Sequence, residues 1–370
     1  MSGSQGQRAR ARSVRYHRHL FRIQSRRSKV LTLSLLVCLG LVAGAGAFTV
    51  DRMISGTDDN PEVPTRWQRG VNLTAFLPAA YASDKASRAM LTARAAGTEL
   101  VALTPTSYME NAQSDEVVSD PQKTPTDASV LAAARKAQSL GLKVAIKPHV
   151  DVKDGTFRGE ITPLDRGAWF QSYGELVDRY AELAQRANAA YFVIGTELTS
   201  MTPDEVAWRG LIQRARDRFD GKIIFAANWV DGAEQINFWD ALDAIGIDGY
   251  MPLGDDPEPT VEELVEQWGP YAARMGALHD RWGKRVLFTE LGYESRVGTA
   301  ARIGAGTAPL SEKAQADAYE AAFQALSPLP FFRGIWWWEW SAEGLGIGDG
   351  DGGFSPEGKA AADVLEAWQG

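Results

Sequence analysis

Short apolar runs alternate with longer Ala-rich amphipathic segments along the chain from residue 66 onward. The predicted strands are 70–73, 99–104, 143–147, 191–195, 222–226, 244–248, 285–289 and 333–337. Strands that alternate with helical patterns predict a parallel sheet. Because eight such strands close a (β/α)₈ barrel, typically of about 250 residues, we expect an α/β fold of the TIM-barrel type.

The segments between these runs predict helices and long loops. Helices are expected at 128–140, 170–188, 204–219 and 312–326, with a last one starting at Ser355, because serine followed by Pro356 is typical of a helix start. Loops are expected chiefly at 105–128, 148–170 and 291–311. Without an internal repeat, 66–370 is interpreted as one barrel domain, and 51–65, rich in Asp, Gly, Pro and Thr, as a linker.

The first 50 residues have the pattern of an export segment. Residues 1–29 carry nine Lys and Arg and no acid, and 30–50 are uncharged. Twenty-one such residues are long enough to cross a bilayer as a helix. We expect 1–29 to be a basic cytoplasmic arm and 30–50 a single transmembrane signal anchor that leaves the barrel outside the cytoplasm. The alternative is a signal peptide cut after the small residues 45–47, which would make the protein secreted.

Composition narrows the chemistry of the body. All 47 acidic residues but only 30 of the 39 Lys and Arg follow residue 50, and so acidic a body argues against nucleic-acid binding. The single cysteine, Cys38, lies outside the body, and only His149 and His279 lie within it. We therefore expect no metal, no cofactor and no disulfide, and interpret the protein as a monomer. The run 348–353 matches G-x-G-x-x-G, but no βαβ unit follows it, so we interpret it as a flexible loop.

Two glutamates stand at the ends of predicted strands. Glu197 ends the fourth strand and Glu290 ends the seventh. One such glutamate has a simple alternative explanation as the first solvated residue after a strand. In a barrel, however, the carboxyl ends of the strands form one mouth, so both side chains would meet there. Paired carboxylates are what glycoside hydrolysis needs, one as acid/base and the other as nucleophile or base.

Aromatic and polar residues at other strand ends are candidates for sugar binding. All 12 tryptophans lie in the body, and strand alternation predicts Trp336, Trp338 and Trp340 on one face, with Trp338 as a platform for a sugar ring. Core packing is the expected role of a second set: Trp169, Trp208, Trp239, Trp268 and Trp282. The remaining candidate substrate-binding residues end strands three, five and six: Lys147, His149, Asn228, Trp229 and Tyr250.

Several of these segments together resemble glycoside hydrolase family 113 over roughly residues 66–368. The similar segments are 147–159, 194–198, 225–229, 245–250 and 288–293. The resemblance implies a (β/α)₈ barrel of clan A and a retaining mechanism, most often of an endo-β-1,4-mannanase. It implies Glu197 as general acid/base, Glu290 as nucleophile and Tyr250 as a hydrogen-bond partner of the nucleophile. Thr196 stands where many clan relatives have asparagine, which weakens a xylanase or cellulase assignment.

The sequence therefore predicts a retaining glycoside hydrolase that cleaves β-1,4-linked mannan or its oligosaccharides with two glutamates. Three alternatives stay open at this point. The enzyme acts on another envelope or exopolysaccharide β-glycan, it transfers the glycosyl group to a second sugar, or the barrel binds carbohydrate without catalysis. The first two use the same covalent intermediate, and the presence of both glutamates argues against the third.

Overall fold

Eight parallel strands close into a barrel at the centre of the computed structural model, which describes residues 64, 67–304, 306–348 and 350–369. The barrel strands are β1 (Gln68–Thr74), β2 (Leu100–Thr104), β4 (Lys143–Ile146), β6 (Tyr191–Thr196), β7 (Lys222–Asn228), β8 (Ile245–Asp248), β9 (Val286–Leu291) and β10 (Phe332–Ser341). Their order is β1-β10-β9-β8-β7-β6-β4-β2, so each strand pairs with its predecessor in the barrel and β10 closes on β1. The eight predicted strands and the predicted barrel are confirmed.

Side chains alternate between the barrel interior and the layer under the helices. On β2, Leu100 and Ala102 belong to the small inner cluster, whereas Val101 and Leu103 belong to the large outer core. This alternation is expected for a strand buried on both faces, which is why these strands appear as continuous apolar runs in the sequence.

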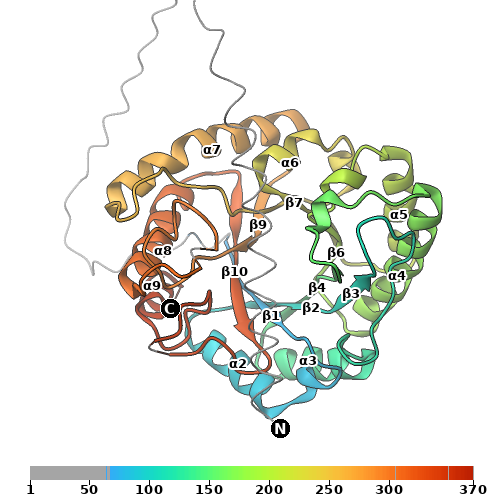
Figure 1. The fold of residues 1–370 in the computed structure, drawn as a ribbon, viewed down its shortest axis with the longest axis horizontal. Coiled ribbons are helices and arrows are strands. Elements are labelled where there is room, and N and C mark those ends of the chain that lie inside the picture. The colour runs from blue at the N-terminus through green and yellow to red at the C-terminus, as the bar shows by residue number, and fades with distance from the viewer. Residues whose placement is uncertain (1–63, 65–66, 305, 349, 370) are drawn as a thin grey trace, which may run out of the picture.

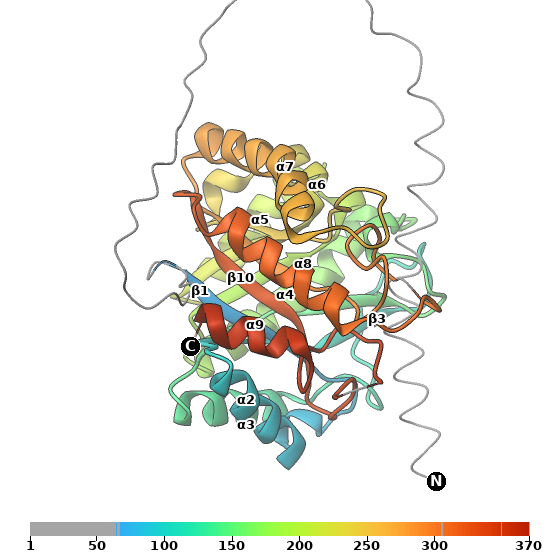
Figure 2. The ribbon, with the colours of Figure 1, turned by 90° about the vertical axis from the view of Figure 1, so that its left-hand side faces the viewer.

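Helices surround the barrel and cover its outer face (Figure 1). They are α2 (Asp84–Ala95), α3 (Asp127–Ser139), α4 (Arg166–Arg186), α5 (Glu205–Arg216), α6 (Trp229–Gln235), α7 (Val261–Trp282), α8 (Glu312–Leu326) and α9 (Ala360–Gln369). In the side view, α8 and α9 lie across β1 and β10 (Figure 2). Thr260 and Glu263 form a capping box at the start of α7, which satisfies free backbone N–H groups there.

The predicted core tryptophans pack between barrel and helices, with one exception. Trp169, Trp208, Trp239 and Trp268 are fully buried. Trp282 is only partly buried, and the Arg281 guanidinium lies 4.9 Å from the centre of its ring.

Two regions predicted as loops contain strands. β3 (Thr106–Met109) and β5 (His149–Val152) form a separate two-stranded parallel sheet within 105–128 and 148–170. They continue the direction of β2 and β4 after a short break, at Pro105 and Pro148, which lack the N–H that a ladder needs.

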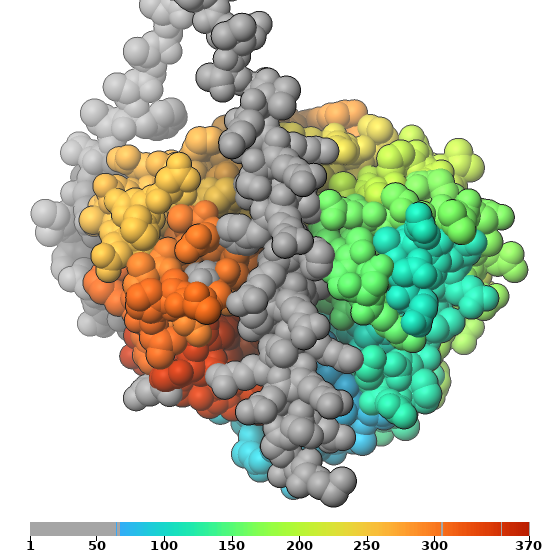
Figure 3. Space-filling view, viewed as in Figure 1, coloured from blue at the N-terminus to red at the C-terminus, as the bar shows by residue number. Residues whose placement is uncertain are grey.

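In the space-filling view, the teal and green segments and the orange and red segments occupy opposite sides of the molecule (Figure 3).

The predicted start of the last helix is wrong. Helix α9 begins at Ala360, and the Ser355 hydroxyl accepts a hydrogen bond from the Glu357 N–H in a turn before it. The glycine at 358, with φ +74°, interrupts any continuous helix from Ser355. Serine stabilises a turn by the same hydrogen bond that would cap a helix, so the two are alike in sequence.

The predicted alternation along 336–340 is also wrong. Trp336 packs in the inner cluster, but Trp340 joins Trp337 in the outer core. The register explains this change, because Val71 pairs with Trp337 and Leu73 pairs with Trp340. One extra residue on β10 moves the later side chains to the opposite face.

The predicted cytoplasmic arm, membrane span and linker fall on 1–29, 30–50 and 51–65, almost wholly outside the described residues. Among the helices that the structure describes, none is both long enough and apolar enough to cross a bilayer.

Glycine at 246 is required by a close approach between β8 and β7. A Cβ atom there would lie 2.4 Å from the backbone oxygen of Phe225. We expect Gly246→Ala to lower the free energy of unfolding by about 1–3 kcal/mol, as overpacked cores do. Gly210→Ala is the matched control, because no heavy atom lies within 4 Å of the added Cβ on α5. It should raise that free energy by about 0.5–1 kcal/mol. Denaturant titration measures both, and equal effects would contradict the steric explanation.

Candidate active site

Glu290 lies near the carboxyl end of β9 and is 2% exposed. Its backbone pairs in register with Asp248 at the end of β8. The Tyr250 hydroxyl donates a hydrogen bond to Glu290 Oε2 at 3.0 Å, which is the contact that the family resemblance implies. His149 Nε2 lies 3.3 Å from the other carboxyl oxygen, Oε1.

A buried lysine forms an ion pair with Glu290. The Lys147 ammonium is fully buried and donates to Glu290 Oε1. The same nitrogen lies 3.1 Å from His149 Nε2 and 3.5 Å from Asp248 Oδ2. One cation therefore faces two carboxyl groups and an imidazole in an environment without solvent.

The balance of charges favours the ionised form of Glu290. Burial by itself would raise the pKa of this carboxyl, but the Lys147 charge and hydrogen bonds from His149 and Lys147 outweigh it. The net result is a pKa well below the ordinary range of a glutamate. Glu290 is thus a carboxylate at neutral pH, as a nucleophile needs to be.

Asp248 responds in the opposite direction. Burial, followed by the negative charge of Glu290, raises the pKa of Asp248 well above its usual value. The Thr289 hydroxyl donates to Asp248 Oδ1 at 2.7 Å but does not compensate. A single buried cation faces both carboxyl groups, and it stabilises the anion of Glu290, so the protonated form of Asp248 is favoured.

Neutral groups complete the surroundings of Glu290. Burial, and then the charges of Lys147 and Arg158, lower the pKa of His149 well below its usual value, so the imidazole is neutral at pH 7. Burial, followed by the negative charge of Glu290, raises the pKa of Tyr250 well above its usual value, so its hydroxyl stays protonated. Glu197 and Glu290 both lie at the carboxyl ends of barrel strands, β6 and β9, and therefore at the same end of the barrel.

Glu197 follows β6 directly and is 1% exposed. Its backbone has φ +55°, an uncommon conformation for a glutamate, and its N–H donates to the Ala226 carbonyl at 2.8 Å. Gly159 packs against this backbone, since a Cβ at 159 would lie 2.9 Å from the Glu197 oxygen. Such a backbone, held by its neighbours, is typical of functional sites.

Arg158 is a cation beside Glu197. It is 2% exposed, and its Nη1 lies 3.9 Å from Glu197 Oε2. Its Nη2 donates to Asp151 Oδ1 at 2.7 Å. Asp151 is on β5, so the small sheet outside the barrel positions a charged group against this glutamate.

Three further candidates lie at or near the carboxyl ends of barrel strands. Trp338 is 5% exposed, and its ring stacks on His149 with 5.7 Å between ring centres. Trp229, with φ +57°, begins α6 and packs partly buried against Tyr250 and Trp338. Asn228 is half-buried as the last residue of β7.

The structure brings most predicted site residues together, but two of them contact Glu290 instead of facing the open site. Lys147 and His149 are candidate substrate-binding residues by sequence, yet both contact the carboxyl group of Glu290 and have 0% and 4% exposure. Sequence reasoning missed Asp248 and Arg158. For Asp248 a signal existed, because an acid inside an apolar strand is unusual. Arg158 lies within 147–159, one of the segments that carry the family resemblance, but its place beside Glu197 depends on how the loop after β5 folds.

No group of three His, Cys, Asp or Glu side chains within the described part of the chain is arranged to hold a metal ion. Lys147 occupies the place beside Glu290 and Asp248 where a cation would be expected.

Comparison with known proteins identifies a family that matches most of the chain. The model of glycoside hydrolase family 113 matches residues 76–354. The GH113 β-mannanase AaManA from Alicyclobacillus acidocaldarius, solved with ManMIm, is 28% identical with a TM-score of 0.74, covering 83% of this chain and 97% of that one. A GH113 β-1,4-mannanase complex is 25% identical with a TM-score of 0.74, covering 81% of this chain and 98% of that one.

More distant structures share only the fold. The β-glucuronidase from Ruminococcus gnavus is 12% identical with a TM-score of 0.54, and the match covers 81% of this chain and 50% of that one. No protein with a curated description matches the chain.

The raised pKa of Asp248 has a measurable effect on stability. A carboxyl group whose pKa is higher in the folded than in the unfolded protein stabilises the fold at low pH. This stabilisation is lost as the pH rises from the pKa of the unfolded state, about 3.9, through the pKa of the folded state. The asparagine side chain cannot titrate, so we expect the free energy of unfolding of Asp248→Asn to improve relative to wild type as pH rises from about 4 to about 8. Denaturant titration at several pH values measures this difference.

Asp280→Asn, on the exposed surface of α7, is the control and should show no such trend. A constant difference between Asp248→Asn and wild type across pH would mean that Asp248 is ionised in the folded protein.

Proposed function

The chain belongs to glycoside hydrolase family 113, and from this membership we propose that it hydrolyses β-1,4-linked mannan with retention of the anomeric configuration. The observation that carries the mechanism is the pair of buried glutamates at the ends of β6 and β9, of which Glu290 is held ionised. The proposed substrate rests on the two GH113 β-mannanases, which match almost over their whole length.

In the proposed reaction, Glu290 attacks the anomeric carbon while Glu197 gives its proton to the leaving oxygen. A covalent bond forms between Glu290 and the sugar, and the glycosidic bond breaks. Glu197, now a carboxylate, takes a proton from water, which attacks the same carbon and releases Glu290. Two displacements at one carbon retain its configuration.

The groups around Glu290 support its proposed role as nucleophile. Lys147 and Tyr250 each contact one carboxyl oxygen, so both oxygens are oriented before substrate arrives. His149 is neutral, so it does not form a second ion pair with the Glu290 carboxylate. Because burial favours the protonated form of Asp248, the negative charge beside Lys147 lies on Glu290 before the covalent bond forms.

The aromatic side chains support a sugar as ligand. Trp338 and Trp229 lie against Tyr250 in one cluster at the same end of the barrel. Aromatic faces pack well on the apolar faces of sugar rings, and the indole N–H adds a polar edge. We propose Trp338 as the platform for the sugar that is attacked, and Asn228 and Trp229 as further contacts to the substrate.

The proposal is tested by incubating the protein with β-1,4-mannohexaose and following the products by mass spectrometry and anomeric NMR. We expect shorter mannooligosaccharides whose new reducing ends first appear as the β-anomer. Products longer than the hexaose would instead indicate glycosyl transfer, and an initial α-anomer would contradict retention.

Glu290→Gln is the control for the same experiment. It is nearly isosteric, and Asp248 Oδ2 remains 3.5 Å from the Lys147 ammonium as its ion-pair partner, so the fold should persist. Turnover should fall by at least ~10⁴-fold, since the nucleophile is absent. Near wild-type hydrolysis by this variant would contradict the proposed role of Glu290.

Lys147→Met should shift the pH dependence of hydrolysis. Without the ammonium, the remaining burial raises the pKa of Glu290, so its carboxylate form requires a higher pH. We expect the acidic limb of the kcat/KM profile to move upward by about 1–3 pH units, the usual effect of a neighbouring opposite charge. Lys143→Met, at the exposed first position of β4, removes the same charge at the other end of the strand and should leave the limb unchanged. An unmoved acidic limb in Lys147→Met would contradict this account.

A further inference from the structure

A cavity of about 300 Å³ lies at the carboxyl ends of β1 and β10. Thr74 and Ser341 are the last residues of these two strands, and Glu294 follows the end of β9 by three positions. The cavity therefore lies at the same end of the barrel as Glu197 and Glu290. Its volume is at the lower limit of pockets that bind small ligands, about 300–1,000 Å³.

One aromatic side chain connects this cavity to the catalytic glutamates. Phe354 lines the cavity and packs edge to face on Tyr250, with 6.3 Å between ring centres. Tyr250 in turn donates its hydrogen bond to Glu290. Glu339, which also lines the cavity, follows Trp338 directly in the chain. The cavity is thus a neighbour of the site where the glycosidic bond is cleaved.

Hydrogen bonds hold the outer wall of the cavity in place. Gln315 on α8 donates to the Phe354 carbonyl at 3.0 Å and to the Tyr293 carbonyl at 2.8 Å. The Asp351 carboxyl accepts from the Gly353 N–H at 2.6 Å, and the buried Lys359 ammonium lies 3.7 Å from Asp351. The glycine-rich segment that the sequence suggested as a flexible loop is therefore braced where it lines the cavity. Because these residues are already held in place, little conformational entropy is lost when a ligand binds.

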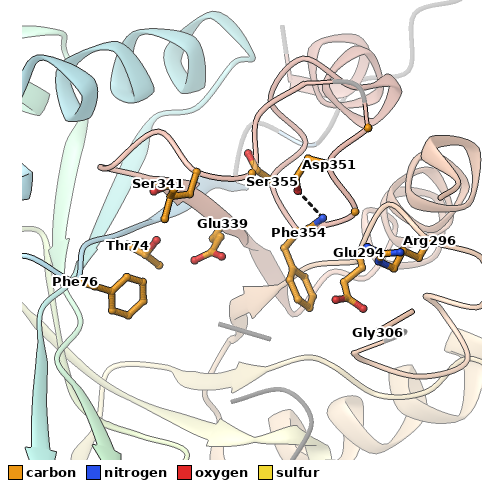
Figure 4. A pocket seen from close by; sticks show the side chains of 15 residues that line it. Thr74, Phe76, Glu294, Arg296, Gly306, Glu339, Ser341, Asp351, Phe354 and Ser355 are labelled. Atoms are coloured by element: carbon orange, nitrogen blue, oxygen red, sulfur yellow. Dashed lines mark hydrogen bonds between the residues drawn. The ribbon is translucent and has the colours of Figure 1, made fainter. Parts of the chain in front are cut away.

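Acidic side chains point into this space. Glu294 and Glu339 lie on either side of the Phe354 ring, with their carboxyl groups toward the open centre (Figure 4). Asp351 is the third acid of the lining, and Arg296 is the cation among the described lining residues. The Arg296 guanidinium donates to the Ala308 carbonyl at 2.6 Å and packs on Gly352, so it serves the wall.

We propose that this cavity is a subsite for one sugar unit of the glycan substrate, and that its carboxyl groups restrict that unit to an uncharged or amine-bearing sugar and exclude a uronic acid. The inference deepens the proposed function and rests on it. Sugar hydroxyls would donate to Glu294 and Glu339, because carboxylates accept several hydrogen bonds, and the Phe354 ring would pack on the sugar face.

Exclusion follows from the same groups. A carboxylate on the bound sugar would meet two carboxyl groups and, among the described lining residues, no cation other than Arg296, which is held by the wall. Like charges placed together oppose binding. An ammonium on the sugar would be attracted by these groups instead. The lining thus distinguishes three sugars of similar size by charge alone.

The test uses the full chain and β-1,4-mannan in which a small fraction of units is oxidised at C6 to the carboxylate. Mass spectrometry of the products gives the position of each oxidised unit relative to the cleaved bond. The two units that share the cleaved bond are set aside. For wild type, we expect that at one of the other positions the carboxylate occurs at least tenfold less often than on average in the polymer. In Glu294→Gln/Glu339→Gln, this depletion should fall to less than twofold.

Glu175→Gln is the matched control, because it removes the same charge on the exposed surface of α4, and its depletion should equal that of wild type. If the double variant is poorly folded by circular dichroism, Glu339→Gln alone provides the test, with a depletion at least twofold smaller than that of wild type. The same experiment with mannan aminated at C6 should give the opposite result. In the products of wild type, the ammonium-bearing unit should be enriched at that position, and in those of the double variant it should not.

The outcomes separate this inference from the proposed function. Cleavage of unmodified mannohexaose together with equal depletion in wild type and the glutamate variants would overturn the subsite and leave the function standing. Absence of depletion in wild type would do the same. If wild type does not cleave unmodified mannohexaose, the proposed function fails, and the subsite for that substrate fails with it.

Discussion

The ion pair between Lys147 and Glu290 is the interaction on which the rest of the site depends. A buried ammonium is costly unless it is paired, and losing one member of a buried pair typically costs about 3–5 kcal/mol. Here one ammonium follows the end of β4, while its two carboxyl partners lie on β8 and β9. The pair therefore connects strands from opposite parts of the barrel, and it decides which of Glu290 and Asp248 carries the negative charge.

The two glutamates are held by different parts of the fold. Glu290 lies within a barrel strand, and its contacts come from the ends of neighbouring strands and of β4. Glu197 has left its strand, and Arg158, which follows the small β3–β5 sheet, lies beside it. The ionised group is thus fixed by the rigid barrel, and the group that is proposed to exchange protons is contacted by a segment added to it. The cavity near Phe354 is bounded by a third part of the fold, the carboxyl ends of β1 and β10 together with the segments after β9 and β10.

Much of the architecture could be predicted because burial leaves a local record in the sequence. Strands covered on both faces must be apolar throughout, so all eight barrel strands were recognisable, and the acids that end them were conspicuous. The predictions that were wrong concern features without such a record. The loop segments at 106–109 and 149–152 pair only because β2 and β4 are neighbours, and the extra residue on β10 that moves Trp340 is visible only against β1. At Ser355 a turn and a helix start have the same residue preferences.

By itself, the sequence determined the barrel, the two glutamates at its mouth and a likeness to glycoside hydrolase family 113, since these follow from periodicity and from short motifs. Only the tertiary structure decided that Lys147 and His149 contact Glu290, that Asp248 competes with it for one cation, and that Arg158 lies beside Glu197. The physical reason is that a charge acts over a few ångströms of space in a medium of low dielectric. Residues about a hundred positions apart, such as Lys147 and Asp248, meet at that distance only when the barrel closes.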